Sequence, residues 1–298
     1  MNKVLELFCK STASQSSKDG WKKIIDKRQC LFLHRACLKN RKSNPDVLIG
    51  TCMVSHGRKN QPVIICPHRF LERRQIFLDA IHLLTLHEPG NELHIVPEIA
   101  LPGGSVDYFL VSARKKKVRD FVGIELQTLD TTGTAWPERQ RFLHSVGIPV
   151  KKTELESQDG FGMNWKMTAK TILVQLHHKI NTFEHLNHKL VLVIQDHLLE
   201  YMKVNFDFGH MANPARQGDS MHIHAYCLDQ IPTKEYHIEL AQRLSTDAAG
   251  VGRSLGLQAN ARIELEAIHA QLEAKISSNT LFEFGPIPSD DSVSIRHD

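Results

Sequence analysis

Three consecutive segments in the middle of the chain alternate apolar and polar residues with a period of two, and this pattern constrains the fold more than any other feature. The segments are 94–101, 105–113 and 121–129. Pro102-Gly103-Gly104 between the first two is typical of a hairpin turn, and a basic turn over 114–120 precedes the third. The sequence therefore predicts three neighbouring strands of one sheet.

Other segments indicate what surrounds these strands. Residues 189–196 (KLVLVIQD) are apolar on both faces, as in a central strand of a parallel or mixed sheet. Residues 70–87 and 164–186 space their apolar side chains at helical intervals. Further helices are expected over 197–206 and 262–276, and a further strand over 221–230. The prediction is an α/β (α+β) fold with a central mixed sheet flanked by helices.

The length of 298 residues corresponds to about two domains at roughly 150 residues each. We divide the chain into an N-terminal segment (1–20), a cysteine-containing subdomain (21–69), a main domain (70–280) and a tail (281–298). The net charge, 37 − 33 = +4, permits a nucleic-acid partner without showing one. No apolar run reaches the roughly 20 residues of a membrane helix, so we expect no membrane association. Residues 1–10 lack the apolar core of a secretion signal, so we expect a reducing, cytoplasmic location.

Two acidic residues on neighbouring predicted strands indicate a metal site. Asp107 lies in one strand, and Glu125 and Gln127 lie two apart in the next, so the latter two share a face. Converging carboxylates repel unless a cation lies between them, and hard oxygen ligands suit Mg²⁺, which can activate water and polarise a phosphodiester. The order acid, hairpin, acid-x-polar resembles the PD-(D/E)XK nuclease fold, in which the last position is usually Lys. The alternative is that both acids are solvated residues of an amphipathic hairpin.

Four cysteines near the N-terminus indicate a second metal site. Cys30, Cys37, Cys52 and Cys66 follow the spacing C-x6-C-x14-C-x13-C. Four thiolates can close a tetrahedral Zn²⁺ or Fe site, and metal binding can supply folding free energy that a segment with little apolar periodicity lacks. Without a C-x-x-C pair, scattered buried thiols remain the alternative. Cys9 and Cys227 lie outside the set and are expected to be packed thiols.

Basic clusters could contact phosphates, although each alone is typical of a solvated surface. Among them are Arg69-Arg73-Arg74, 114–119 and Arg139-Arg141. His222 and His224 lie close to Cys227, but surface or phosphate-facing histidines are favoured over another metal site.

The strings PEIALPGGSVDYFLVS and DFVGIELQTLDTTGTAWPERQ resemble the NotI family of restriction endonucleases, as does the cysteine-rich segment with its ICPHRF string. The resemblance covers roughly residues 30–200. It implies that Asp107, Glu125 and Gln127 form the catalytic metal site, with Glu98 of the PEI string as a further acid and Glu92 as a less favoured substitute. In that family the last position of the motif is Gln, so the resemblance implies that Gln127 is an intact site residue. It also implies iron in the four-cysteine site, although composition leaves zinc open, and Leu31 departs from an expected Cys-Pro-Phe.

The resemblance implies a type II restriction endonuclease of bacterial cytoplasm. Such an enzyme cleaves both strands of double-stranded DNA at a GC-rich palindrome as a Mg²⁺-dependent homodimer, and a cognate DNA methyltransferase protects the host genome. One alternative is a DNA repair or junction-resolving nuclease on the same fold. Another is a non-catalytic, metal-stapled DNA-binding protein, against which the retention of Asp107, Glu125 and Gln127 argues.

Overall fold

The computed structural model describes residues 3–14, 16–41, 44–158, 160–232 and 235–256, with residues 269, 270 and 273–275 in addition. Residues 1–258 form one unit, and residues 259–298 form a second. Most of the helix predicted over 262–276, and the whole tail 281–298, lie outside the described residues. No helix within the described part of the chain is both long and apolar enough to span a membrane.

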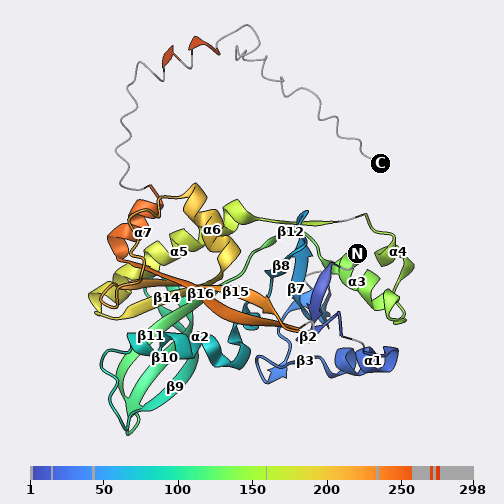
Figure 1. Ribbon diagram of the computed structural model, residues 1–298, viewed down its shortest axis with the longest axis horizontal. Helices are drawn as coiled ribbons and strands as arrows, with labels where there is room; N and C mark the ends of the chain where they lie inside the picture. The colour runs from blue at the N-terminus through green and yellow to red at the C-terminus, as the bar shows by residue number, and fades with distance from the viewer. Residues whose placement is uncertain are drawn as a thin grey trace, which may run out of the picture. The chain divides into compact units, whose positions relative to one another are not determined.

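A six-stranded mixed sheet is the centre of the first unit (Figure 1). In sheet order its strands are β16 (Tyr236–Thr246), β15 (Met221–Gln230), β14 (Lys189–Gln195), β11 (Lys117–Gln127), β10 (Gly104–Arg114) and β9 (Glu92–Leu101). β9, β10 and β11 pair antiparallel, β14 is parallel to both β11 and β15, and β16 is antiparallel to β15. The predicted mixed sheet is confirmed, and β16 is a strand that the pattern did not predict.

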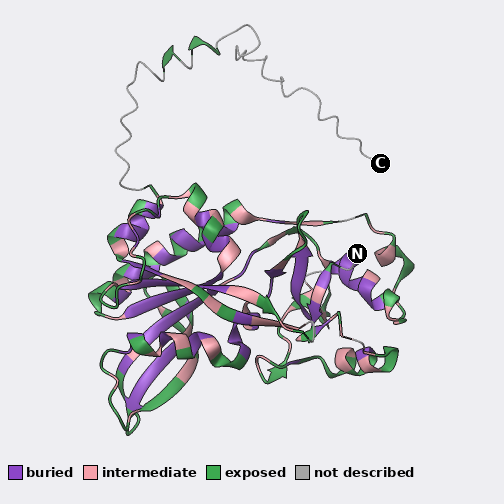
Figure 2. Ribbon diagram, viewed as in Figure 1, coloured by how far each residue is buried: buried purple, intermediate pink, exposed green. Residues whose placement is uncertain are grey.

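Helices cover both faces of this sheet. α5 (Trp165–His185) and α6 (Asp196–Asn205) pack on one face, and η1 (Pro67–Arg74) and α2 (Gln75–Ala80) pack on the other (Figure 1). β14 is buried at every position, with alternate residues in the two apolar clusters (Figure 2). The interior strand predicted over 189–196 is therefore confirmed, because both its faces are covered by helices.

The single helix predicted over 70–87 is wrong. The chain instead forms η1, α2 and the short η2 (Ile81–Leu83), with non-helical backbone angles at Glu72 and Arg73. The Glu72 carboxylate accepts hydrogen bonds from the Arg69 guanidinium and from the Ile238 N–H, each at 2.8 Å. These buried polar contacts hold the chain in the kink, which a pattern of apolar residues cannot reveal.

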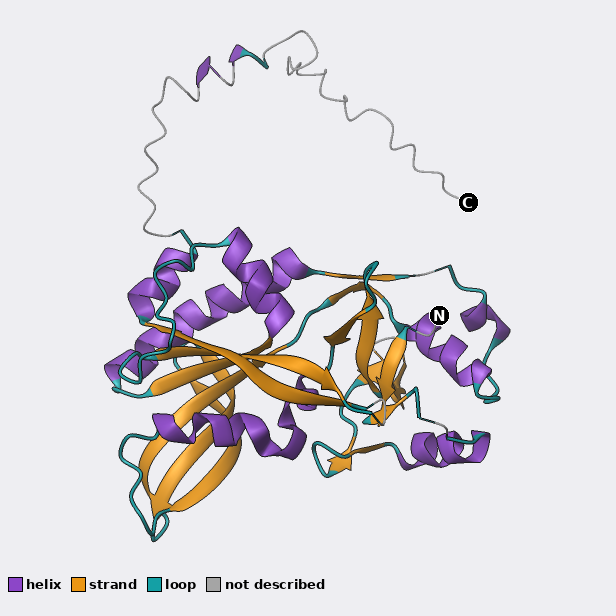
Figure 3. Cartoon of the chain, viewed as in Figure 1, coloured by secondary structure: helices purple, strands orange, loops and turns teal. Residues whose placement is uncertain are grey.

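The N-terminal region has its own antiparallel sheet in the order β2-β1-β7-β8 (Figure 3). Those strands are β1 (Val4–Leu7), β2 (Lys10–Ser11), β7 (Thr51–His56) and β8 (Gln61–Ile64). Short ladders join β3 (Gln29–Cys30) to β4 (Arg35–Ala36) and β5 (Asn40–Arg41) to β6 (Asn44–Leu48). Trp21 of α1 (Lys18–Lys27) meets Phe142 of α3 (Trp136–Ser145) edge to face at 4.9 Å. The region therefore buries more apolar surface than its sequence pattern indicates.

The remaining elements are short. β12 (Thr131–Gly133) pairs with β13 (Phe161–Met163), and α4 (Lys152–Leu155) follows α3. α7 (Ala248–Ser254) begins at the N-cap Asp247, whose side chain accepts from the Gly250 N–H. α7 follows β16 and ends the continuously described part of the chain.

Candidate active site

The pairing of β10 with β11 brings Asp107 and Glu125 together. Tyr108 pairs with Ile124, so one step further along the ladder Asp107 faces Glu125. Asp107 Oδ2 accepts a hydrogen bond from the Leu126 N–H at 2.8 Å, in place of a main-chain contact. The exposed Asp107 carboxylate is therefore held against the strand that carries Glu125.

Both carboxylates line a cavity of about 440 Å³ between strands β10 and β11 and helix α5. Gln127 also lines this cavity, and its Nε2 donates to the Thr128 carbonyl at 2.6 Å. The predicted group Asp107, Glu125 and Gln127 thus shares one cavity wall. Gln175 and Lys179 of α5 also line the cavity, and the sequence pattern predicted no role for either.

Lys179 forms a buried ion pair with Glu125. The Lys179 Nζ lies 2.7 Å from Glu125 Oε1, and the two side chains are 8% and 7% exposed. Burial raises the pKa of Glu125 to about 7, while Lys179 lowers it and the neighbouring Asp107 raises it further. A carboxyl group poised near neutrality beside a second acid in a cavity is typical of functional sites.

The two further acids lie on β9, outside the cavity wall. The pairs Ile99–Val106 and Pro97–Tyr108 leave Glu98 opposite Asp107, but its backbone has a φ of 38° and its side chain is exposed. Glu92 is exposed at the start of β9, where it lies 3.5 Å from His94. Neither acid is among the described residues that line the cavity, and Glu98 is the closer to Asp107 by register.

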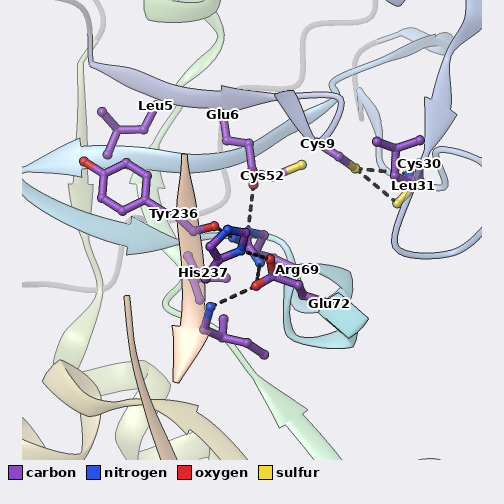
Figure 4. A network of polar contacts seen from close by, with 12 residues as sticks. Leu5, Glu6, Cys9, Cys30, Leu31, Cys52, Arg69, Glu72, Tyr236 and His237 are labelled. Atoms are coloured by element: carbon purple, nitrogen blue, oxygen red, sulfur yellow. Dashed lines mark hydrogen bonds and ion pairs between the residues drawn. The ribbon is translucent and has the colours of Figure 1, made fainter. Parts of the chain in front are cut away.

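Five cysteines line one small void of about 10 Å³ in the N-terminal region. They are the predicted Cys30, Cys37, Cys52 and Cys66, together with Cys9. Figure 4 shows the Cys9 and Cys30 thiols side by side, with sulfur atoms 3.7 Å apart. Contact with Cys30 and Cys52 lowers the pKa of Cys9 to about 3, and contact with Cys52 lowers the pKa of Cys66 to about 4. The sequence spacing placed Cys9 outside the predicted set of four cysteines, but in the folded chain Cys9 lines the same void as those four.

The donor chemistry of this void suits a thiolate metal site. Tetrahedral ligands at a metal–sulfur distance of about 2.3 Å lie about 3.8 Å from one another. The 3.7 Å between Cys9 and Cys30 has that length, although this pair includes a cysteine outside the predicted four. No three His, Cys, Asp or Glu side chains in the described part of the chain already stand at metal-binding distance. Cys227 lies on β15, where its thiol donates to the Glu239 carbonyl at 3.5 Å.

A buried ionic network lies beside the cysteines. Arg69, only 1% exposed, bridges Glu6 of β1 at 3.0 Å and Glu72 at 2.8 Å (Figure 4). Arg69 also donates to the Tyr236 carbonyl of β16, so the network joins the N-terminal sheet to the central sheet. Arg69 therefore serves the fold and is not available to a phosphate.

Two other sets of polar residues are also buried, contrary to the sequence-based expectation. Arg139 is 5% exposed and donates to the Ile49 carbonyl at 2.6 Å. His222 and His224 are 1% and 0% exposed, so the prediction that they face solvent or phosphate is wrong. Burial lowers the pKa of His222 to about 4 and that of His224 to about 3, so both are neutral at physiological pH.

Comparison with models of known protein families finds no match to this chain, and comparison with curated proteins finds none either. The resemblance to the NotI family therefore stays a prediction from the strings around Asp107 and Glu125 and from the cysteine segment. The side chains that these strings bring together are the basis for a functional proposal.

Proposed function

We propose that the protein is a Mg²⁺-dependent nuclease that cleaves double-stranded DNA as a type II restriction endonuclease of the NotI type. The observation that carries the proposal is the facing position of Asp107 and Glu125, which open with Gln127 into one cavity of about 440 Å³. The mixed order of the central sheet and the helices on its two faces are compatible with a PD-(D/E)XK core.

The two carboxylates fit a magnesium site. Mg²⁺ usually takes one or two protein carboxylates and fills its other positions with water and phosphate oxygens. Asp107 and Glu125 supply that number of hard ligands on an open cavity. When bound there, the ion lowers the pKa of a water and offsets the charge of the phosphate. Asp107 is pre-positioned for this role, because the Leu126 N–H fixes one of its oxygens and leaves the other free of this bond.

The cysteine void fits a structural role. Four of its thiolates would close a tetrahedral site with no open position for water, so this site would not activate a nucleophile. The ligands that we propose are Cys30, Cys37, Cys52 and Cys66, with iron as the metal implied by the resemblance and zinc as the alternative. Such a site would fix the short ladders β3–β4 and β5–β6, which carry Cys30 and flank Cys37.

The partner is double-stranded DNA, and two-fold symmetry of a palindromic target calls for a homodimer. Neutralised phosphates would supply most of the affinity, and side chains at base edges would supply the specificity. A DNA repair or junction-resolving nuclease would use the same carboxylates without a palindromic sequence preference.

Digestion of unmodified plasmid DNA separates these activities. Protein with excess Mg²⁺ is incubated with several plasmids, and the ends of the products are mapped by sequencing. We expect discrete fragments whose ends share one palindromic sequence. Asp107→Ala protein, purified in parallel, should give none. Cutting at branched DNA alone, or none of any substrate, would contradict the proposal.

A further inference from the structure

The cavity carries one positive charge that the catalytic strand does not supply. Gln127, which lines the cavity beside the two carboxylates, is uncharged. An amide hydrogen-bonds in both directions but contributes no net charge. Of the described residues that line the cavity, Lys179 alone is cationic, and it comes from α5, far from Gln127 in the sequence.

The fold holds Lys179 at this position firmly. Its neighbours Leu176, Ile180 and Phe183 are buried against the sheet, so the stripe of α5 that contains Lys179 faces inward. The turn before β10 packs directly on the helix, because a Cβ on Gly103 would lie 2.3 Å from the His178 carbonyl oxygen. A hydrogen bond of 3.2 Å from Thr182 to the Pro102 carbonyl fixes the same contact.

Burying this ammonium is costly unless the group is paired. Removing an ammonium from water carries a large penalty, against which the ion pair with Glu125 acts. Lys166 and Lys170 of the same helix lie in solvent, so α5 can carry lysine without that penalty. The Lys179 ammonium lies at the wall of the cavity, with its Nζ 2.7 Å from Oε1 of the candidate catalytic residue Glu125. This position indicates that the ammonium interacts with a substrate group in the cavity.

We propose that Lys179 is a catalytic residue, supplying from helix α5 the ammonium that a strand lysine at position 127 would supply. The inference rests on the proposed nuclease function. In the hydrolysis, a water oxygen bonds to phosphorus and one ester P–O bond breaks. The water leaves its hydroxyl group on the phosphate, and its other proton ends on the departing oxygen.

The ammonium acts by charge and hydrogen bonding. Negative charge builds up on the non-bridging phosphate oxygens as the new bond forms. A lysine Nζ has three hydrogen-bond donors, and Lys179 uses one on Glu125, so it can donate another to such an oxygen. Loss of one such donor typically costs about 100- to 1,000-fold in rate.

The test compares Lys179→Met with Lys170→Met, a matched change at an exposed site on the same helix. Single-turnover cleavage of duplex DNA is measured with Mg²⁺, DNA binding is measured by anisotropy with Ca²⁺, and folding is followed by thermal unfolding. We expect Lys179→Met to cleave at least about 100-fold more slowly with DNA binding within threefold of wild type. Lys170→Met should match wild type in all three.

A relocated lysine separates a catalytic charge from a structural one. Adding Gln127→Lys to Lys179→Met restores an ammonium to the same cavity from the strand, and we expect at least tenfold recovery of the rate. Cleavage by Lys179→Met within threefold of wild type would overturn the inference, as would a loss of DNA binding equal to the loss of cleavage. A double variant no faster than the single variant would also overturn it. Wild-type protein that cuts no DNA would instead contradict the proposed function itself, and this inference with it.

Discussion

At the scale of single residues, the candidate site is defined by charges that the fold has taken out of water. Glu125 and Lys179 are almost completely buried, whereas Asp107 remains exposed on the neighbouring strand. The two acids therefore have different environments in one cavity, and burial raises the pKa of Glu125 to about 7. Substitutions that change charge without changing shape are the sharpest probes of such a site.

Asp107→Asn and Glu125→Gln should each lower the cleavage rate at least about 100-fold, because each removes a negative ligand for the ion that stabilises the transition state. Asn keeps an oxygen that can accept from the Leu126 N–H, so Asp107→Asn tests the charge and not the backbone contact. Single-turnover cleavage and DNA binding give the two readouts, with binding expected to be retained. Glu88→Gln, a matched change at an exposed residue outside the site, should cut at the wild-type rate. A near-wild-type rate from either site variant would refute the assignment of that residue.

His224 should make the protein sensitive to acid. It is fully buried, and neither ring nitrogen has a hydrogen-bond partner among the described residues. Burial, with Arg243 nearby, lowers its pKa from 6.5 to about 3. The unfolded chain therefore binds a proton between those pH values while the folded chain does not, so stability is full above pH 6.5 and is lost as the pH falls below it.

The measurement is the free energy of unfolding from pH 7.5 to pH 4.5 for wild type, His224→Leu and the exposed control His185→Leu. Buried Glu6 and Glu125 have pKa values raised to about 7, so their contribution to the free energy of unfolding increases as the pH falls, opposite to that of His224. The informative quantity is therefore the difference between each variant and wild type. We expect His224→Leu to lose roughly 2 kcal/mol less than wild type across the range, and His185→Leu to parallel wild type. Parallel curves for all three would show that His224 does not titrate in this way.

At the scale of elements, the sequence predicted what repeats along the chain and missed what depends on tertiary contacts. The strands over 94–129 follow from alternation and the Pro-Gly-Gly turn, and α5 follows from helical spacing. Lys179 was missed because a lysine on a helix is ordinarily a solvated residue. One signal was present in the sequence. Lys179 falls within the apolar stripe of α5 formed by Leu176, Ile180 and Phe183, so its side chain had to be buried with them.

Other failures have the same cause. The kink at Glu72 depends on contacts with Arg69 and with β16, which lies more than 160 residues away. Cys9 lies 21 residues before Cys30, and it reaches the same void only because β1 pairs with β7. Spacing rules compare residues along the chain, so they cannot register partners that meet through a sheet.

The cysteine void should hold about one transition metal per chain, bound by Cys30, Cys37, Cys52 and Cys66. Each of these four changed to Ser should lower the metal content and the unfolding temperature, because the site contributes folding free energy. Cys227→Ser on β15 is the distant control, and Cys9→Ser tests the adjacent thiol; both should keep the metal. Elemental analysis and thermal unfolding of protein never exposed to chelator give the readouts. Metal-free wild type, or loss of metal on changing Cys9 with none on changing Cys37, would contradict this ligand set.

At the scale of the whole molecule, we propose two metal sites in one unit, a catalytic magnesium site at the carboxylates and a structural site at the cysteine void. The central sheet carries the carboxylates, and the N-terminal sheet packs beside the cysteines. The Arg69 network ties the two sheets together. A rigid connection of this kind would keep the cysteine void in a fixed relation to the cavity lined by Asp107 and Glu125.

The active species should be a homodimer, because a palindrome presents the same half-site twice. With a chain mass of 33.8 kDa, two chains give a protein mass of about 68 kDa. Light scattering after gel filtration should give this mass without DNA. With a short cognate duplex and Ca²⁺ in place of Mg²⁺, it should give this mass plus that of one duplex. A monomer that nicks one strand at a time would favour the repair-nuclease alternative.

The most direct test of the central claim asks which metal performs the chemistry. Protein is treated briefly with EDTA, desalted and assayed for plasmid cleavage with Mg²⁺, Fe²⁺ or Zn²⁺ added back, while elemental analysis follows the cysteine-bound metal. A carboxylate site exchanges its ion readily, whereas a closed thiolate site does not. The account predicts that cleavage stops with EDTA and returns with Mg²⁺ while the thiolate-bound metal stays in place. Rescue by Fe²⁺ or Zn²⁺ alone, with Mg²⁺ ineffective, would contradict it.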